Sequence, residues 1–414
     1  MLRSAVLLAC AHALTCAAQW TQLVHPLVDR CDDLYFLNAD TGWAAGGGSG
    51  RILRTYDGGD FWWIVGEFDT YLRSIEFLDA QKGFCGSLDG NLYRSTDGGT
   101  TWTDMMDELP QAVPGVCGLC APDAQTIYGT GVFFGPAHVI KSTDAGATWQ
   151  HIDMSAHAWC LIDVLFFNGT TGLVAGGAAN EANGASIFRT TDGGATWTEV
   201  FNTGSGYEWV WKLQSPDGVH VYASIENGSL APTRIARSAD AGLTWSLDTV
   251  SPSNWRLQGI GFLNDTLGWT GDNVFYTSTD GGESWSQSIG VPGFNRFHRV
   301  NDDLAFAGGH AISRYRRSGV GMAEFTRPEA KERVRVHPSP TSASAVGECV
   351  VHRRSHARIA LRTTEGRLVR EYHNGYLEAG THTYPLDLGA LPAGTYWFSL
   401  YTNLGFVSVP VVKE

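Results

Sequence analysis

The chain has 414 residues and a net charge of −13, from 29 lysine and arginine residues against 42 aspartate and glutamate residues. Residues 331–414 hold ten basic and seven acidic side chains, so the excess of negative charge lies in residues 1–330. This balance argues against a nucleic acid partner, because phosphate binding needs a basic face. Aromatic residues make up 12% of the chain and glycines number 50, which is typical of many short strands joined by tight turns.

The first 18 residues have the pattern of a secretory signal peptide. Arg3 supplies a basic start, residues 5–14 form a short apolar core, and Cys16–Ala18 places small side chains before a cleavage site, so we expect the mature chain to begin at Gln19. A lipoprotein signal with its lipobox at Leu7–Cys10 would leave a very short apolar core and is the weaker alternative. The core is shorter than the roughly 20 apolar residues that cross a bilayer, and we expect no transmembrane segment elsewhere.

An eight-residue motif, S/T-x-D-x-G-x-T/S-W, recurs six times. Its aspartates are 40–48 residues apart, which fits the repeat of about 40–45 residues of a four-stranded propeller blade. The copies are Thr55–Trp62, Ser95–Trp102, Ser142–Trp149, Thr190–Trp197, Ser238–Trp245 and Ser278–Trp285. The first copy has Phe61 where the others have Thr or Ser.

The motif has the chemistry of a turn. Its Asp can accept hydrogen bonds from backbone N–H groups two residues on, its Gly supplies a positive φ, and its Trp anchors the strand that follows. We therefore expect structural roles for Asp57, Asp97, Asp144, Asp192, Asp240 and Asp280, and for Trp62, Trp102, Trp149, Trp197, Trp245 and Trp285. Catalytic acids or calcium ligands are the disfavoured alternative, because one site cannot use six spaced copies of one loop.

A second signature, of the form FLNxxTGWxxG, marks a strand, a turn and another strand ahead of each box. Seven such hairpins, three of them weak, stand against six boxes. The last unit stops at Arg317 without a box, while Trp20–Leu23 matches the strands that follow the boxes. The sequence therefore predicts an all-β fold with a seven-bladed propeller over residues 19–317, closed by the N-terminal strand. Six blades are the alternative if the seventh unit packs differently.

Six cysteines follow the expected signal peptide, namely Cys31, Cys85, Cys117, Cys120, Cys160 and Cys349. Cys117–Cys120 has the form of a CxxC redox or zinc motif. It falls on a predicted inner strand, where residues three apart point to opposite faces. Separate buried thiols, or pairing with other blades, are therefore favoured, and we expect no metal and no cofactor.

Arginine and aromatic residues gather just ahead of the predicted inner strands, at one mouth of the central channel. The candidates for a binding rim are Arg30, Arg73, Arg256, Arg296, Trp159, Trp211 and Trp255, with Tyr71, Trp209 and Phe294 beside them. Such a rim suits a polypeptide segment, a carboxylate or a glycan. The alternative is that the arginines pair with acids such as Asp32 and Asp163 while the tryptophans fill space between blades.

The pattern changes after residue 317. Residues 318–333 have no strand alternation and indicate a linker. Residues 334–414 contain short alternating strands, which predict a small Ig-like β-sandwich.

The two repeated signatures resemble the Asp-box, or BNR, propellers of photosystem II assembly factors and sortilin-like proteins. Those assembly factors hold a partner protein on an arginine-bearing face, so the resemblance implies a non-catalytic binding or scaffold module. Asp-boxes also occur in sialidases and xyloglucanases. However, the Phe/Tyr-Arg-Ile-Pro segment of sialidases is absent, a Tyr–Glu pair cannot be assigned, and xyloglucanases use two propellers where one is predicted here. An extracellular glycoside hydrolase of these types, or a glycan-binding module, is the alternative function.

Residues 334–414 resemble the C-terminal sorting domain of the type IX secretion system. The resemblance is carried by Pro338-Ser339-Pro340, the Gly366-Arg367 turn and the segment LDLGALPAGTYWFSL at Leu386–Leu400. It implies that the secretion machinery of a Gram-negative bacterium takes the protein across the outer membrane, to the cell surface or beyond. An ordinary adhesive Ig-like domain is the alternative.

Overall fold

The computed structural model describes residues 19–204, 206–228, 232–253, 257–271, 274–288, 293–317, 333–351, 355–364, 367–402 and 405–414. The expected signal peptide and all but the last residue of the expected linker lie outside the described residues. In the described part, strands form almost all of the regular structure, with two short helical turns, η1 (Met106–Glu108) and η2 (Glu181–Asn183). The prediction of an all-β chain is confirmed.

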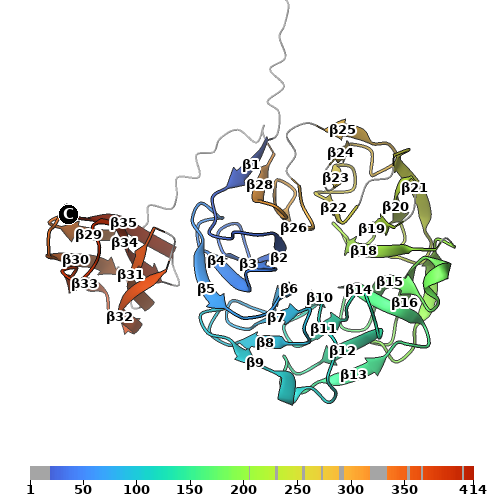
Figure 1. The fold of residues 1–414 in the computed structure, drawn as a ribbon, viewed down its shortest axis with the longest axis horizontal. Coiled ribbons are helices and arrows are strands. Elements are labelled where there is room, and N and C mark those ends of the chain that lie inside the picture. The colour runs from blue at the N-terminus through green and yellow to red at the C-terminus, as the bar shows by residue number, and fades with distance from the viewer. Residues whose placement is uncertain are drawn as a thin grey trace, which may run out of the picture.

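Four-stranded antiparallel sheets follow one another around a common axis in the first part of the chain (Figure 1). We number the sheets 1 to 7 in chain order, and the first strand named in each lies nearest the axis. Sheet 1 contains β2 (Cys31–Phe36), β3 (Gly42–Gly46), β4 (Arg51–Thr55) and β5 (Trp63–Glu67); sheet 2 contains β6 (Leu72–Phe77), β7 (Gly83–Ser87), β8 (Leu92–Ser95) and β9 (Thr103–Asp104); and sheet 3 contains β10 (Gly118–Cys120), β11 (Ile127–Thr130), β12 (His138–Ser142) and β13 (Gln150–Asp153). Sheet 4 contains β14 (Ala158–Phe166), β15 (Gly172–Ala178), β16 (Ala185–Thr190) and β17 (Thr198–Asn202), and sheet 5 contains β18 (Glu208–Gln214), β19 (Val221–Asn227), β20 (Thr233–Ser238) and β21 (Ser246–Ser251). Sheet 6 contains β22 (Gly259–Phe262), β23 (Gly268–Gly271), β24 (Phe275–Ser278) and β25 (Ser286–Ser288), and sheet 7 contains β26 (Arg296–Asn301), β27 (Leu304–Gly308), β28 (Ile312–Arg316) and β1 (Gln19–Leu23). The repeated sheets have the arrangement of a propeller.

The two ends of the ring meet in sheet 7. Strand β1 pairs with β28 in antiparallel register, from Gln19 opposite Arg316 to Leu23 opposite Ile312. This is the pairing that the complementarity of the two segments predicts. Trp20 anchors it with ring edges against Trp269 of sheet 6 and Tyr315 of sheet 7, at centroid distances of 5.3 and 5.4 Å. The closure gives sheet 7 its fourth strand, so that it has the same number of strands as the other sheets of the ring.

The two repeated sequence signatures meet in one recurring contact. The phenylalanine that ends an inner strand stacks on an aromatic ring from the preceding sheet, and the box tryptophan meets the same phenylalanine edge-on. Three such sets are Phe306–Phe36–Trp62, Tyr128–Phe166–Trp197 and Tyr222–Phe262–Trp285, with stacked centroids 3.4–3.5 Å apart and the Trp rings at 82–90°. These geometries are favourable for aromatic pairs, so each repeat contributes both to its own sheet and to the packing between sheets.

Each box aspartate is held by its own turn, as the box at Ser142–Trp149 illustrates. Asp144 Oδ1 accepts hydrogen bonds from Ser142 Oγ and Thr148 N, both at 2.8 Å, and Oδ2 accepts one from Thr148 Oγ1 at 2.6 Å. Gly146 has a φ of +79° and donates its N–H to Ser142 Oγ at 2.8 Å. The carboxylate therefore reaches the residue four positions on, instead of the two positions that a simple Asx turn predicts.

These hydrogen bonds make the boxes sensitive to acid. The hydroxyls of Thr148, Thr196, Thr244 and Ser284 are the largest cause of a pKa of about 2 at Asp144, Asp192, Asp240 and Asp280, below the usual 3.8. Because these pKa values are lower in the folded state, the stabilisation is present above pH 4 and is lost as the pH falls from about 4 to about 2. We expect the thermal midpoint of the full chain to drop over this interval, and Thr148→Val with Thr196→Val to reduce the drop. A midpoint that stays constant down to pH 2 would contradict this account.

The CxxC segment does not bring its two thiols together as a reactive pair. Cys117 is buried ahead of β10, with its thiol beside Arg73, while Cys120 Sγ accepts a hydrogen bond from Phe166 N at 3.2 Å. Burial is the largest cause of a raised pKa at both thiols. The six cysteines of the described chain form no disulfide with one another, in keeping with separate buried thiols.

The C-terminal residues form two sheets around one hydrophobic core. Strands β29 (Arg333–His337), β30 (Ser344–Val351) and β33 (Gly380–Asp387) make one sheet, and β32 (Leu368–Leu377), β31 (Ser355–Thr363), β34 (Gly394–Thr402) and β35 (Gly405–Lys413) make the other. The core between them includes Cys349, Ile359, Phe398 and Leu400. We call residues 333–414 the C-terminal module.

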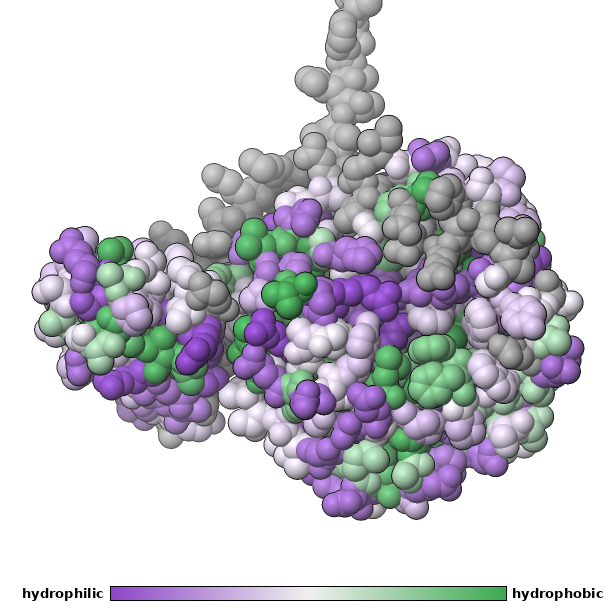
Figure 2. All heavy atoms as spheres, in the orientation of Figure 1, coloured by the Kyte–Doolittle hydropathy of each residue, from purple (hydrophilic) through white to green (hydrophobic). Residues whose placement is uncertain are grey.

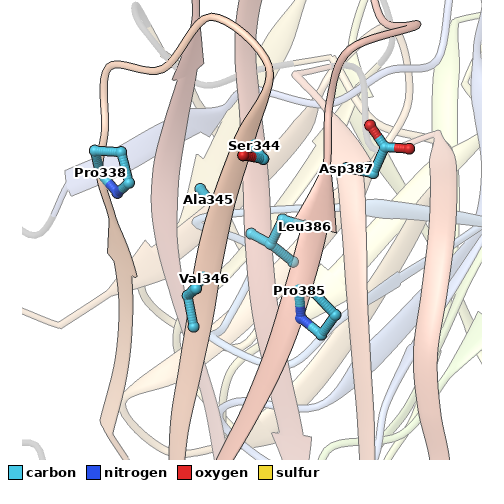
Figure 3. A pocket seen from close by; sticks show the side chains of 7 residues that line it. All are labelled: Pro338, Ser344, Ala345, Val346, Pro385, Leu386 and Asp387. Atoms are coloured by element: carbon cyan, nitrogen blue, oxygen red, sulfur yellow. The ribbon is translucent and has the colours of Figure 1, made fainter.

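The Pro338-Ser339-Pro340 segment lies beside the last strand of the module, and Gly366 of the predicted Gly366-Arg367 turn lies outside the described residues. Ser339 Oγ accepts a hydrogen bond from Val412 N at 3.1 Å, and Thr341 pairs with the final residues, so the Pro-x-Pro segment is fixed against β35. A recess of about 320 Å³ opens between β29, β30 and β33 (Figure 3). Its lining consists of Pro338, Ser344, Ala345, Val346, Pro385, Leu386 and Asp387.

Candidate binding site at the propeller axis

The inner strands of four sheets break their register at the same level. The pairing between the first two strands skips Asp32 in sheet 1, Arg73 in sheet 2, Ile162 in sheet 4 and Trp211 in sheet 5. A bulge of this kind turns the extra residue out of the ladder and re-aims its side chain. Three of the four bulged residues make side-chain contacts with other sheets at the axis, so the bulges build the site.

Arg296 joins carboxylates from two other sheets. Its Nε donates to Asp33 Oδ1 of sheet 1 at 2.7 Å, and its Nη2 donates to Asp163 Oδ1 of sheet 4 at 3.2 Å. Backbone N–H groups complete both acids, from Ile75 to Asp33 Oδ2 at 3.1 Å and from Leu213 to Asp163 Oδ2 at 2.8 Å. Burial opposes the charge of Arg296, but Asp163 and Asp33 together raise its pKa. Because sheets 1, 4 and 7 stand around the axis, the guanidinium lies across the channel.

Two further arginines of the predicted rim share one acid. Arg73 and Arg30 both form ion pairs with Asp32, which is fully buried. Arg73 is 2% exposed, whereas 29% of the Arg30 side chain is exposed. Arg30 Nη1 also donates to Gln258 Oε1 at 2.8 Å. Of the described rim arginines, Arg30 is therefore the one most open to solvent.

Trp211 closes the channel above this network. Its Nε1 donates to Asn295 Oδ1 beside sheet 7 at 3.0 Å, and the guanidinium of Arg73 from sheet 2 lies 5.2 Å from its ring centroid. Phe133, in the loop after β11 of sheet 3, lies 6.0 Å from the same ring. A side chain of sheet 5 that touches sheets 2, 3 and 7 must cross the axis. Trp211 is 7% exposed, so it lies as a buried floor beneath the mouth, beside the ion pairs of the axis.

Lys212 is a buried lysine that the sequence analysis did not single out. Its side chain is 2% exposed and, among the described residues, Nζ has no hydrogen-bond partner. Burial and then the neighbouring Arg296 lower the pKa of Lys212 to about 7. Burial and then Asp33 raise the pKa of Glu76 to about 8. Beside these two groups, the guanidinium groups of Arg30, Arg73 and Arg296 face three aspartates, so their charges balance at the centre of the propeller.

Aromatic side chains surround the mouth above Trp211. Phe133 and Phe134 are 41% and 50% exposed, and Tyr207, just before β18, is 60% exposed. Trp159 and Trp209 are half-buried against Cys160 and Ile162 in sheet 4 and Trp211 in sheet 5. We call Phe133, Phe134, Trp159, Tyr207 and Trp209 the mouth aromatics. The propeller face in Figure 2 carries hydrophilic residues across its middle with hydrophobic residues next to them.

The predicted rim residues thus occupy different depths. Arg73, Arg296 and Trp211 lie inside the channel, Arg30 and Trp159 lie at its mouth, and Arg256 and Trp255 lie outside the described residues. Residues that sequence reasoning missed are Asp33, Lys212, Asn295, Phe133 and Phe134. Lys212 could have been found from the sequence, because it directly follows the candidate Trp211. Phe133 and Phe134 could not, because they lie outside both repeated signatures.

The central acids have little freedom for proton transfer or metal binding. Asp33 and Asp163 share Arg296, and Asp32 holds Arg30 and Arg73. In the described part of the chain, no group of three His, Cys, Asp or Glu side chains is arranged to hold a metal ion. The same part contains no helix with the length and apolarity to cross a membrane. The arrangement is suited to recognition at the mouth above a fixed, charge-paired floor.

Together the sheets, the box turns and the channel define the class of this protein as an Asp-box β-propeller with an additional β module. A family model described as BNR/Asp-box repeat matches residues 276–287. No curated protein sequence matches the chain significantly.

Solved structures of several proteins share the fold. The structure titled YCF48 bound to D1 peptide is 18% identical with a TM-score of 0.54, and the match covers 73% of this chain and 97% of that one. The GH74 xyloglucanase from Xanthomonas campestris is 14% identical with a TM-score of 0.54, over 81% of this chain and 60% of the enzyme. PorZ of Porphyromonas gingivalis, described as an essential bacterial surface component of the type IX secretion system, is 13% identical with a TM-score of 0.53, over 93% of this chain and 59% of PorZ. At these identities the likeness establishes the propeller fold alone.

Proposed function

We propose that this chain is an exported, non-catalytic, seven-bladed propeller that binds a polypeptide segment at the mouth of its channel. The observation that carries the proposal is the group of mouth aromatics around Trp211, of which Phe133, Phe134 and Tyr207 are exposed. An extended segment laid over this floor would bury Phe133 and Phe134, and a carboxylate on it would meet Arg30. Aromatic and arginine side chains are the residues that most often dominate binding energy at protein interfaces.

Two considerations favour a polypeptide over glycan hydrolysis. A retaining or inverting glycosidase needs one carboxyl group to donate a proton and a second to act on the sugar. The described central aspartates, Asp32, Asp33 and Asp163, are buried and form ion pairs with arginines. The structurally similar YCF48 is described as bound to a peptide, which supports the same ligand class here.

Export is the second half of the proposal. The pattern of the first 18 residues supports passage across the inner membrane, and the C-terminal module, with its Pro-x-Pro and LPAGTY segments, supports sorting by the type IX machinery. In this proposal the module is an Ig-like sorting domain and the propeller acts at the cell surface or beyond. Expression in a host with this system, with and without residues 333–414, tests it; surface exposure that does not need the module would contradict it.

The binding half is tested with 12-residue peptides displayed on phage and selected on the full mature chain. We expect Phe133→Ser with Phe134→Ser to weaken a selected peptide by at least about 30-fold, the loss typical of an interface hot spot. Val219→Ser with Leu243→Ser is the matched control, since these apolar residues are 48% and 54% exposed in a β18–β19 turn and in a box. Equal binding by both variants would exclude the mouth. Turnover of a glycan panel would instead favour a hydrolase, and saturable sugar binding without turnover a glycan module.

A further inference from the structure

The first Asp-box, together with the residue that follows it, differs from the other five copies at three positions. Tyr56, Phe61 and Trp63 are aromatic where the other boxes have small or polar residues. The corresponding residues are Thr96, Thr143, Thr191, Ala239 and Thr279; Thr101, Thr148, Thr196, Thr244 and Ser284; and Thr103, Gln150, Thr198, Ser246 and Ser286. All of these are exposed, while Trp63 is 2% exposed.

The substitution at position 61 removes a hydrogen bond that the motif otherwise makes. Phe61 N still donates to Asp57 Oδ1 at 2.9 Å, as in the other boxes. A phenylalanine has no hydroxyl to donate to the second carboxylate oxygen, as Thr148 does to Asp144. The turn of the first box therefore lacks the hydroxyl bond that the other five boxes make, and some other contact must account for the aromatic residues.

All three aromatic side chains contact the C-terminal module. Tyr56 and Trp63 lie 5.2 and 5.4 Å from Tyr401, and Phe61 lies 6.3 Å from Trp397, measured between ring centroids. The guanidinium of Arg362 lies 4.6 Å from the Trp63 ring centroid, within the range of a cation–π contact. In Figure 1 the module, coloured red, lies beside sheet 1, which is blue.

The module meets the propeller with the outer face of a sheet. Along β31 and β34 the residues Ile359, Leu361, Phe398 and Leu400 point into the core of the module. Side chains alternate along a strand, so Ala360, Arg362, Ser399 and Tyr401 point to the opposite face. That face of a sandwich is normally polar and solvated. Here these four residues are between 0% and 7% exposed, which shows that the face is covered.

We propose that the first Asp-box is a docking surface for the C-terminal module. Tyr56, Phe61 and Trp63 receive the outer face of the sheet formed by β31 and β34, with Trp63 stacked against Arg362 and Tyr401. The module is then held at one place on sheet 1 instead of moving freely on the segment that joins it to the propeller. This interface does not depend on the role of either domain in export or ligand binding.

Small-angle X-ray scattering of the full mature chain tests the docking. The triple variant Tyr56→Thr, Phe61→Thr, Trp63→Thr gives box 1 residues that the other boxes carry, so we expect the propeller to fold. We expect a larger radius of gyration and maximum dimension than in the wild type, because the module is released. The matched control is Thr191→Ala with Thr198→Ala, because in the fourth copy these residues correspond to Tyr56 and Trp63. This control should scatter like the wild type.

A variant of the C-terminal module separates loss of docking from a folding defect in the first Asp-box. Arg362→Ser with Trp397→Ser leaves the propeller sequence intact and should produce the same expansion, with an unchanged circular dichroism spectrum. The proposal is overturned if both variants scatter like the wild type. It is equally overturned if the wild type already has the extended distance distribution of a module that moves on its linker.

Discussion

Replacing Arg296 by glutamine is expected to lower the free energy of unfolding by about 3–5 kcal/mol, the usual cost of removing one partner from a buried ion pair. The loss follows from the position of Arg296 between Asp33 and Asp163, which are 3% and 0% exposed. Without the guanidinium, two buried carboxylates would face each other at the axis without the partner that they share. Urea denaturation of the full chain, followed by tryptophan fluorescence, measures the change.

A surface pair provides the matched control. Arg51 pairs with Glu67 at 3.0 Å, but the two side chains are 30% and 63% exposed. Exposed pairs of this kind contribute about 0–1 kcal/mol, so Arg51→Gln should change the free energy of unfolding little. Losses of similar size in the two variants would mean that the central network is no more important to stability than a surface ion pair.

Replacing Lys212 by methionine is expected to change how stability depends on pH. Burial gives Lys212 a pKa of about 7 in the folded chain, against 10.5 for an ordinary lysine. Between these values the unfolded chain holds a proton that the folded chain has released, so the free energy of unfolding rises with pH by at most about 1.4 kcal/mol per unit. The penalty of burying the charge is largest below pH 7. Lys212→Met should remove the rise and stabilise the protein most at pH 7 and below.

Denaturation curves at pH 7 and pH 10 decide this prediction. The wild type should gain stability between the two values relative to Lys212→Met, while Lys141→Met should keep the wild-type difference. Lys141 serves as the control because its Nζ donates to Gly193 O at 2.9 Å from a half-buried position in sheet 3. A wild type and a Lys212→Met variant with parallel pH profiles would show that the amine is charged throughout, or that it reaches water.

The proposed peptide-binding site and the proposed docking surface lie at different places on the propeller. Phe133 and Phe134 lie at the channel mouth, whereas Tyr56, Phe61 and Trp63 lie on the outer part of sheet 1. Variants at one place are therefore expected to leave the other function intact. A peptide that still binds the triple box variant, and a compact Phe133→Ser, Phe134→Ser variant, would establish this independence.

The sequence by itself determined the repeating unit. The box turn is built from residues within seven positions of one another, so its hydrogen bonds can be inferred from the motif. The strand–turn–strand signature and the match of Trp20–Leu23 to the outer strands rest on short-range patterns as well, and the observed pairing of β1 with β28 agrees with them. Composition and the repeated strand–turn–strand signature were enough to predict the all-β class.

Only the tertiary structure decided what the unit is used for. Arg296 contacts acids 263 and 133 residues away, and these distances along the chain are set by ring closure, which brings equal positions of different repeats to one axis. The bulges at Asp32, Arg73 and Trp211 depend on the pairing between two strands. A local sequence pattern therefore does not predict which side chain each bulge turns inward. Likewise, the aromatic residues of box 1 stand out in the sequence, but only the covered face of β31 and β34 gives the reason for them. Hydrogen bonds within a turn depend on neighbouring residues and can be predicted from them. Contacts across the ring and between domains form only once the chain has closed.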